Sequence, residues 1–329
     1  MSTLAPTLQA FFTDRLIKQR NASPNTIAAY RDTMRLLLAF AQQTLSSEPS
    51  SMDIAELDAP LISAFLDHLE HDRGNSIRTR NARLAAIRTL YRFATLRHPE
   101  HAATIQRVLA IPPKCFAQAT VAYLTDTEIN ALLQAPDLTT WTGRRDRALL
   151  LTAIQTGLRV SELIGLTTTD AHLATGPHVS CHGKGRKTRV TPLTRETAHV
   201  LRVWLDERQG GPADPLFPTR PGRPMSRDAI EHRLVKHVTT AANRCPTLHT
   251  KHVTPHALRH TAAMRLLHAG VDTAVIALWL GHESPNTTQI YLHADLALKE
   301  RAIARTTPPN TPAGRYRPPD KLLAFLEAM

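Results

Sequence analysis

The sequence contains little cysteine. Its 329 residues include three, Cys115, Cys181 and Cys245, which are widely spaced and form no Cys-x-x-Cys pair. An odd, scattered set of this kind is typical neither of a disulfide framework nor of a structural zinc site. We therefore expect a protein of a reducing compartment, the cytoplasm, whose fold rests on a hydrophobic core.

Long apolar segments are also absent. The first apolar stretch, MSTLAPTLQAFFTDRL, is interrupted by Asp14. No later segment reaches the roughly eighteen consecutive apolar residues that a membrane span requires. The sequence therefore predicts a soluble, intracellular chain without a membrane partner.

Acidic residues are scarce relative to basic ones. Forty lysines and arginines stand against 28 aspartates and glutamates, which gives a formal net charge of +12. A basic excess of this size favours a polyanionic partner, although a merely soluble basic protein would show the same composition. The chain is long enough to form two domains with full cores.

The pattern along the chain predicts a mainly α-helical fold in two domains. Residues 1–110 show helical periodicity with good caps, as in SPNTIAAYRDTMRLLLAFAQQ, where Ser23 and Pro24 begin a helix. We expect a linker over residues 111–122, where Pro112 and Pro113 interrupt the periodicity. Residues 123–310 are expected to form a second, α-rich domain, in which HVSCHGKGRKTRVTPL predicts a small β-hairpin.

Residues 311–329 predict a C-terminal tail helix. In RYRPPDKLLAFLEAM, Pro318 and Pro319 interrupt the chain, and Asp320 can cap the helix that follows. Its apolar surface consists of Leu322, Leu323, Phe325 and Leu326. A helix this short is not stable alone, so it must dock on a larger surface.

One helix of the first half separates apolar from cationic residues. In SIRTRNARLAAIRTLYRFA, at about 100° per residue, one side gathers the core candidates Ile77, Leu84, Ile87, Tyr91 and Ala94. A second side carries the stripe Arg78, Asn81, Arg88 and Arg92, and residues 73–97 include seven arginines and no acid. A solvated face usually mixes charges of both signs, so we predict DNA-phosphate contacts here, with a solvent-exposed face as the alternative. Arg80 falls on the apolar side, where the periodicity assigns it no role.

Another helix places histidines and an arginine in its opening turns. TPHALRHTAAMRLLHAG begins with Thr254 as N-cap and Pro255 in the first turn, and Gly270 can end it in a left-handed conformation. His256 and Arg259 lie three residues apart and share a face. Because a cation there faces the positive end of the helix dipole, the placement predicts a bound anion.

The same helix offers a metal alternative, since His256 and His260 lie four residues apart. A zincin helix carries Glu after the first His, whereas this sequence has Ala257, and no acidic ligand follows nearby. We therefore predict no metal site and assign His260 a structural role.

Three further stretches carry candidate polar groups, each with an ordinary alternative. Arg159 and Glu162 in TGLRVSELIGL have the spacing of a surface ion pair. Lys184 in HGKGRKTRV lies between two glycines of a turn, which does not match a Walker loop and usually leaves a lysine solvated. WLGHESPNTTQIYLHAD contains His282 and then Tyr291, in a helix where tyrosine is more often a core residue than a nucleophile.

In this order, TGLRVSELIGL, GKGRKTRVTPL, HALRH and LGHESPNTTQIYLHAD resemble the tyrosine recombinase (phage integrase) family, and within it the Xer-type enzymes. The resemblance covers residues 123–295, and the helical first half is similar to the family's SAM-like core-binding domain. It implies that the catalytic residues are Arg159, Lys184, His256, Arg259, His282 and Tyr291.

The resemblance also implies a role for each residue. Arg159 and Arg259 would clamp the scissile phosphate, Tyr291 would be the nucleophile and Lys184 the general acid. His256 and His282 fall on the family's two histidine positions. Glu162 falls on an accessory acidic position that helps order the site.

The expected reaction cleaves and rejoins double-stranded DNA through a 3′-phosphotyrosyl intermediate. Planar guanidiniums stabilise negative charge on the nonbridging oxygens without a metal, and the covalent bond conserves energy, so neither a cofactor nor ATP is expected. The alternatives are a catalytically silent DNA-binding regulator on the same scaffold and a type IB topoisomerase. The resemblance further implies a tetramer on paired sites, with a second recombinase as an optional partner, at the nucleoid in the cytoplasm.

Overall fold

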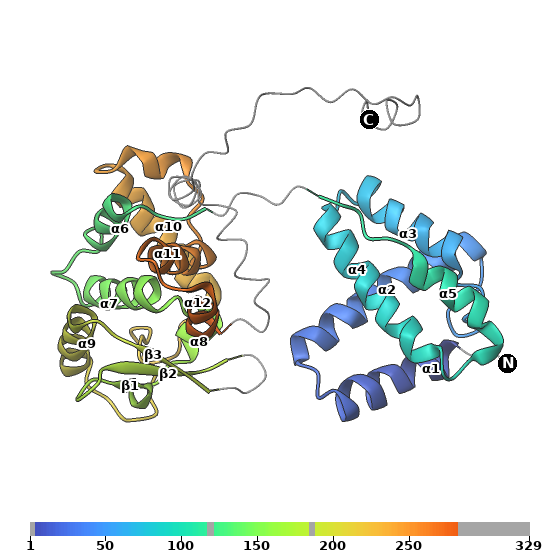
Figure 1. Cartoon of the computed structure of the whole chain (residues 1–329), viewed down its shortest axis with the longest axis horizontal. Helices are drawn as coiled ribbons and strands as arrows, with labels where there is room; N and C mark the ends of the chain where they lie inside the picture. The colour runs from blue at the N-terminus through green and yellow to red at the C-terminus, as the bar shows by residue number, and fades with distance from the viewer. Residues whose placement is uncertain (1–3, 117–121, 184–187, 282–329) are drawn as a thin grey trace, which may run out of the picture. The chain divides into compact units, whose positions relative to one another are not determined.

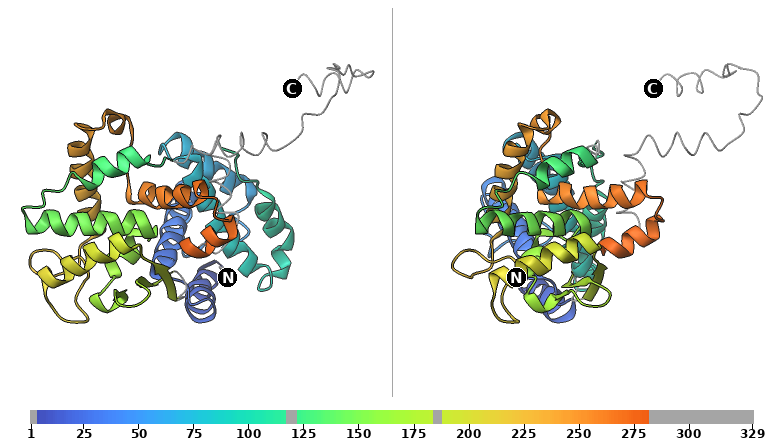
Figure 2. Two further views of the ribbon diagram at one scale, coloured as in Figure 1. Left: turned by 60° about the vertical axis from the view of Figure 1, so that its left-hand side comes forward. Right: turned by 90° about the vertical axis from the view of Figure 1, so that its left-hand side faces the viewer.

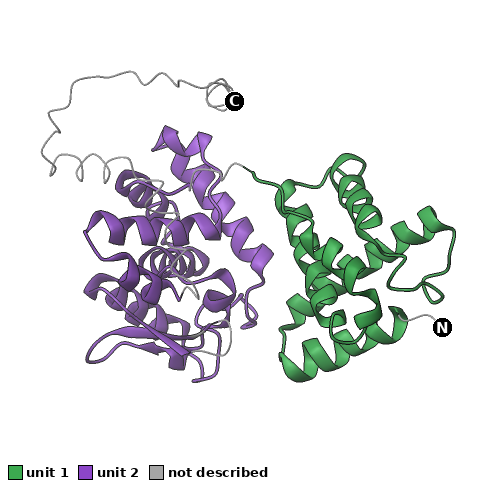
Figure 3. Ribbon diagram, turned by 45° about the vertical axis from the view of Figure 1, so that its right-hand side comes forward, with its two compact units in different colours: residues 1–118 green, residues 119–329 purple. Residues whose placement is uncertain are grey.

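The computed structural model describes residues 4–116, 122–183 and 188–281, and its elements appear in Figures 1 and 2. The chain divides into two compact units, Met1–Gln118 and Ala119–Met329, drawn in green and purple in Figure 3. Each unit has its own hydrophobic core. None of the helices in these ranges is long and apolar enough to cross a membrane.

The first unit is a helical bundle, which confirms the prediction. It consists of α1 (Leu4–Ala10), the π-helix η1 (Phe11–Gln19), α2 (Pro24–Leu45), α3 (Ala59–His71), α4 (Ile77–Ala94), the short η2 (Pro99–His101) and α5 (Ala102–Ala110). The side chains of Ser23, Asp58 and Ser76 accept a backbone N–H in the first turns of α2, α3 and α4. Helix α2 thus begins where the Ser-Pro pair predicts.

Helix α4 carries the predicted core face. Its inner side buries four of the five core candidates, Leu84, Ile87, Tyr91 and Ala94. Arg80 is buried as well, and its Nε lies 3.6 Å from a carboxylate oxygen of Glu70 on α3. This ion pair explains an arginine to which the periodicity assigned no role, since a buried guanidinium needs an acidic partner.

The second unit is also mainly helical and contains a small sheet (Figure 1). Its elements are α6 (Asp126–Leu133), α7 (Trp141–Thr156), α8 (Val160–Gly165), η3 (Thr168–Asp170), β1 (Ala171–His172), β2 (His178–His182), β3 (Thr188–Pro192), α9 (Arg195–Arg208), α10 (Arg227–Ala242), η5 (Pro246–Thr250), α11 (Pro255–His268) and α12 (Thr273–Leu280). Helix α6 begins with a capping box between Thr125 and Glu128.

The three strands form an antiparallel sheet in the order β1, β2, β3. The pair β2 and β3 is the predicted hairpin, and it places Cys181 opposite Arg189. The sequence does not predict β1, because two residues are too few to show the alternation of a strand.

Helices α7 and α11 pack against each other in the second unit, and α12 packs against α11 (Figure 2). Helix α11 ends at His268, and Gly270 follows with φ +81°, the left-handed conformation predicted for it. The C-terminal ends of α7 and α12 are capped by Gly157 and Gly281, both with φ +64°. Gly157 and Leu280 also supply carbonyl oxygens to the same side chain on α11.

A buried ionic cluster joins α7 to α10. The Oδ1 atom of Asp146 accepts hydrogen bonds from Nε and Nη2 of Arg145 at 3.0 and 2.6 Å, and its Oδ2 lies 2.8 Å from Nε2 of His237. Burial raises the pKa of Asp146, but the hydrogen bond with His237 and the charge of Arg145 outweigh it, so this pKa lies below its ordinary value.

We predict that Asp146→Asn lowers the free energy of unfolding by about 3 kcal/mol at pH 7, because it leaves a buried arginine without a charged partner. The folded pKa of Asp146 is depressed, so the stabilisation is complete above the unfolded pKa of about 3.9 and is lost as the pH falls through the folded value. Urea unfolding should therefore show that the difference between wild type and variant narrows below about pH 4. A difference that stays constant from pH 7 to pH 3 would contradict this account.

Candidate functional site

Arg259 is buried near the start of α11, where backbone oxygens hold both of its terminal nitrogens. The helix begins as predicted, with Thr254 accepting the N–H of Ala257 at 3.2 Å. Arg259 is 2% exposed, and its Nη1 and Nη2 donate to the carbonyls of Gly157 and Leu280, each at 2.6 Å. These oxygens lie at the C-terminal ends of α7 and α12, where the helix dipole is negative. The two carbonyls therefore offset part of the unfavourable position of a cation at the start of α11.

Arg159 precedes α8 and pairs with Glu162, but this is not the surface ion pair that the spacing alone favours. The Glu162 side chain is only 4% exposed and accepts from both Nη1 and the backbone N–H of Arg159, each at 2.8 Å. Nη2 of Arg159 donates to the carbonyl of Gly281 at 3.0 Å. Because 34% of the Arg159 side chain stays exposed, its guanidinium is held on one side and accessible on the other.

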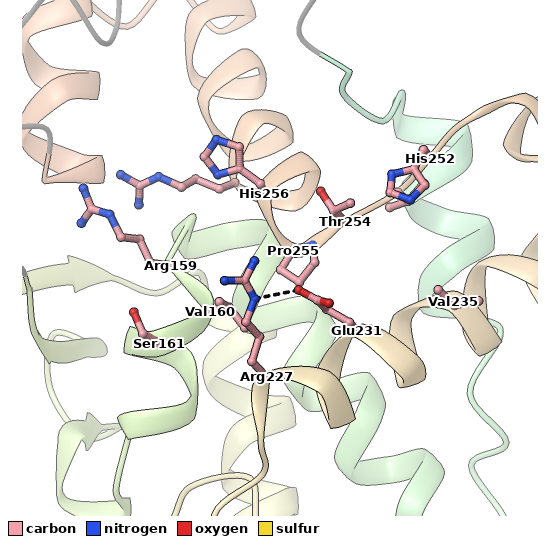
Figure 4. A pocket seen from close by; sticks show the side chains of 12 residues that line it. Arg159, Val160, Ser161, Arg227, Glu231, Val235, His252, Thr254, Pro255 and His256 are labelled. Atoms are coloured by element: carbon pink, nitrogen blue, oxygen red, sulfur yellow. Dashed lines mark hydrogen bonds and ion pairs between the residues drawn. The ribbon is translucent and has the colours of Figure 1, made fainter. Parts of the chain in front are cut away.

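Arg159, Arg259 and His256 line one cavity of about 480 Å³ in the second unit. Figure 4 shows Arg159, just before α8, and His256, on α11, reaching toward the same space. His256 is exposed, and its ring centre lies 4.2 Å from that of His260 in an edge-on arrangement. Tertiary structure thus gathers three of the predicted catalytic residues, two of which are 100 positions apart in the sequence.

The cavity also contains residues that sequence reasoning missed, among them Arg227, Glu231, His252 and Ser161. Arg227 is the first residue of α10, and its Nε donates to Oε1 of Glu231 at 2.8 Å (Figure 4). No local pattern distinguishes Arg227 or His252 from other exposed residues. Only the approach of α10 to α8 and α11 makes them part of the site.

Three predicted site residues, Lys184, His282 and Tyr291, lie outside the described residues, as does the predicted tail helix at 311–329. Of the described residues, no group of three or more His, Cys, Asp or Glu could hold a metal ion. The three cysteines are unpaired, and Cys181 and Cys245 are buried.

In the first unit, two members of the predicted stripe on α4 make contacts within the domain. Asn81 bonds both backbone groups of Lys114, through Nδ2 to its oxygen at 2.8 Å and through Oδ1 to its N–H at 3.1 Å. Nε and Nη2 of Arg88 both donate to the carbonyl of Leu109, at 3.0 and 2.5 Å. These two side chains hold the end of α5 and the segment after it against α4.

Arg78 and Arg92, the other two members of the stripe, are exposed. The guanidinium of Arg78 lies 5.9 Å from the ring centre of Phe116. A cation–π contact leaves the N–H donors of a guanidinium available to other partners. The cationic surface of this helix therefore depends on Arg78 and Arg92 more than on Asn81 and Arg88.

We predict that Gly157→Ala lowers the free energy of unfolding by about 2 to 5 kcal/mol, because left-handed backbone strain adds to overpacking. A Cβ at this position would lie 2.6 Å from Cδ2 of Leu280 and 3.0 Å from Cβ of Ala262. Gly176→Ala is the matched control, since Gly176 has φ +67° and no atom within 4 Å of an added Cβ. Urea unfolding should show a loss of only about 1 to 2 kcal/mol for the control. Equal losses would mean that the site around Leu280 accommodates a methyl group.

Two family models match most of the chain. Residues 122–297 match the phage integrase family, and residues 10–98 match the phage integrase N-terminal SAM-like domain. The putative integrase/recombinase y4rC of Sinorhizobium fredii is 54% identical over 100% of this chain and 99% of its own. The tyrosine recombinase XerD of Pseudomonas putida is 33% identical over 90% of this chain and 96% of its own.

Solved structures share the fold. The XerH site-specific recombinase bound to palindromic difH substrate, in a post-cleavage complex, matches with a TM-score of 0.69 at 22% identity, over 87% of this chain and 81% of that chain. The Tn1549 transposon integrase in complex with a circular intermediate DNA matches with a TM-score of 0.68 at 19% identity, over 91% of this chain and 99% of that chain. These likenesses confirm the predicted fold, a helical SAM-like domain followed by an α-rich domain with a small sheet.

Proposed function

The chain belongs to the phage integrase family of tyrosine recombinases, and from this we propose that Arg159 and Arg259 clamp the scissile phosphate of duplex DNA. It is a site-specific recombinase that acts through a tyrosine. The observation that carries the assignment is the anchoring of both guanidiniums by backbone oxygens beside one cavity.

The anchored guanidiniums suit a transition state better than a ground state. Negative charge grows on the nonbridging oxygens during phosphodiester transfer, and donors that are already in place stabilise it without reorganisation. Arg159 is held by Glu162 and Gly281, so the exposed side of its guanidinium has a fixed orientation. A planar guanidinium can bond two phosphate oxygens at once, which lysine cannot do.

Tyr291 supplies the nucleophile in this proposal. The cavity-lining residues that the structure describes include no tyrosine. Tyr91 is unsuitable, because burial raises the pKa of its hydroxyl, which donates to the carbonyl of Leu57. A phenol with an ordinary pKa of about 10 needs a cationic field or a base to react, and Arg159, Arg259 and His256 offer both.

The chemical step forms one bond and breaks one. The Tyr291 oxygen bonds to the scissile phosphorus as its proton passes to a histidine, and the bond from phosphorus to the 5′-oxygen breaks. Lys184 gives the departing 5′-oxygen a proton, so the products are a 3′-phosphotyrosine and a free 5′-hydroxyl. Rejoining reverses these steps with another 5′-hydroxyl. The reaction requires neither ATP nor a metal ion.

We predict that Tyr291→Phe abolishes covalent trapping on nicked suicide duplexes tiled across the DNA that flanks the native gene, because the variant lacks the attacking oxygen. Wild type and Tyr123→Phe, a tyrosine away from the described lining of the cavity, should both trap DNA, with EDTA present or absent. Denaturing gels read the covalent complex, and mapping its junction identifies the site.

Four outcomes would contradict the mechanism or the assignment to a recombinase. Unchanged trapping by Tyr291→Phe would exclude Tyr291 as the nucleophile, and activity lost in EDTA and restored by magnesium or zinc would exclude metal-free chemistry. Absence of trapping by wild type on every duplex would favour a silent DNA-binding regulator. Relaxation of supercoiled DNA without a defined pair of sites would favour a topoisomerase.

In the first unit, we propose that Arg78 and Arg92 contact DNA phosphates, whereas Asn81 and Arg88 keep α4 and the segment after α5 in place. The double variant Arg78→Ala, Arg92→Ala should flatten the dependence of log K on log salt by roughly 0.9 for each lost phosphate contact. Filter binding at several salt concentrations measures the slope. Arg88→Ala is the control, and we expect it to lower the melting temperature while the slope stays the same.

An unaltered salt slope in the double variant would assign Arg78 and Arg92 to an ordinary solvated face. A flattened slope in Arg88→Ala without any loss of stability would restore Arg88 to the phosphate contacts.

We propose that the chain assembles into a tetramer on paired sites in the cytoplasm, at the nucleoid, with the tail helix docked on a neighbouring protomer. Helix α12 supports an interface of this kind, because Leu278 and Val275 are 76% and 48% exposed. Exposed apolar side chains that lie together on one helix are typical of a contact surface.

Removal of residues 318–329 should leave monomer melting and single-site binding unchanged but reduce cooperative assembly on paired sites, because the tail then stabilises only the assembly. Thermal melting without DNA and gel-shift cooperativity measure the two effects. A large drop in monomer stability would show that the tail docks on its own domain. Failure of the intact chain to pair sites unless a second recombinase is added would make that protein an obligatory partner.

A further inference from the structure

Arg189 on β3 shares the acidic partner of Arg159. Its Nη2 donates to Oε2 of Glu162 at 2.8 Å. The same oxygen accepts the backbone N–H of Arg159, while Oε1 accepts Nη1 of Arg159. One buried carboxylate therefore takes hydrogen bonds from two arginines, and its orientation depends on both.

Arg189 also packs against the second support of Arg159, the left-handed residue Gly281. A Cβ added at Gly281 would lie 2.7 Å from Nη1 of Arg189, so the guanidinium occupies the space beside this glycine. The carbonyl of Gly281 accepts Nη2 of Arg159. Both groups that hold the Arg159 guanidinium are thus in contact with Arg189.

This arrangement is a poor one for stability alone. Nε and Nη1 of Arg189 are enclosed and make no hydrogen bond to any residue that the structure describes, and its side chain is 11% exposed. Enclosed donors without acceptors cost free energy that an apolar side chain would avoid. An arginine whose enclosed donors lack acceptors among the described residues costs stability, so its presence beside a cavity points to a functional constraint.

Arg189 does not reach the reacting atoms itself. Its Nε and Nη1 are shielded from solvent, and it is not among the described residues that line the cavity. It lies on the strand that leaves the hairpin of Lys184, so it connects the base of that hairpin to Glu162.

We propose that Arg189 is a positioning residue for strand cleavage: it holds Glu162 and Gly281, and through them it sets the direction of the Arg159 guanidinium. The inference rests on the proposed function, since it assumes that Arg159 binds the scissile phosphate. A displaced guanidinium would still attract DNA, but it would bond the phosphate oxygens of the transition state less well.

The test is a double-mutant cycle on the nicked duplex that wild type traps best. Under single-turnover conditions with saturating protein, Arg189→Met should slow covalent-complex formation by about 10- to 100-fold, with Kd for the duplex changed less than about 2-fold. In a Glu162→Gln background the same change should cost less than about 3-fold, because the path to Arg159 is already interrupted. Arg189→Lys, which keeps the charge, should recover part of the rate.

Arg195→Met is the matched control, since Arg195 is an exposed arginine three residues after β3, and we expect wild-type rates for it. Should Arg189→Met melt below the assay temperature, Arg189→Lys replaces it in the cycle. A wild-type cleavage rate for Arg189→Met, or an equal loss in both backgrounds, would overturn the proposal. Absence of trapping by wild type would instead overturn the proposed function.

Discussion

The buried guanidinium of Arg259 is the constraint on which the site depends. A cation that is 2% exposed near a helix N-terminus needs negative partners, and the carbonyls of Gly157 and Leu280 provide them at 2.6 Å. These carbonyls are at helix ends, so they carry free acceptor capacity and partial negative charge. The ends of α7 and α12 must therefore meet beside Arg259 at the start of α11, and this contact fixes one of the residues that line the cavity.

A second constraint is the sharing of Glu162. Its single negative charge serves Arg159 and Arg189, and together with Arg259 these side chains leave a formal excess of two positive charges beside the cavity. Because Glu162 is buried, water screens these interactions less than at the surface. The carboxylate thus holds the arginine side chains in place, while their excess positive charge remains to attract a phosphate.

The first unit shows that an arginine-rich helix can serve two purposes. Arg80, Asn81 and Arg88 bind Glu70, Lys114 and Leu109 within the domain, whereas Arg78 and Arg92 remain exposed. Helical periodicity groups these residues by direction alone. It contains no information about a chain segment that lies across the helix, and here residues 109–114 cover part of the predicted stripe.

The sequence alone determined much of this protein, because the relevant forces act over a few residues. Caps at Ser23, Thr125 and Thr254, the left-handed Gly270 and the β2–β3 hairpin follow from local backbone preferences. The order of four motifs was sufficient to indicate the family, and the family models confirm it.

Only the tertiary structure decided how the arginines are held. Nothing near Arg259 in the sequence predicts acceptors at positions 157 and 280, and Arg189 lies 27 positions from Glu162, the carboxylate that it shares with Arg159. Arg227 and His252 likewise enter the cavity through the packing of α10 and the segment before α11. Hydrogen bonds of this kind depend on which helix ends pack together in the folded chain, and local sequence preferences do not determine that packing.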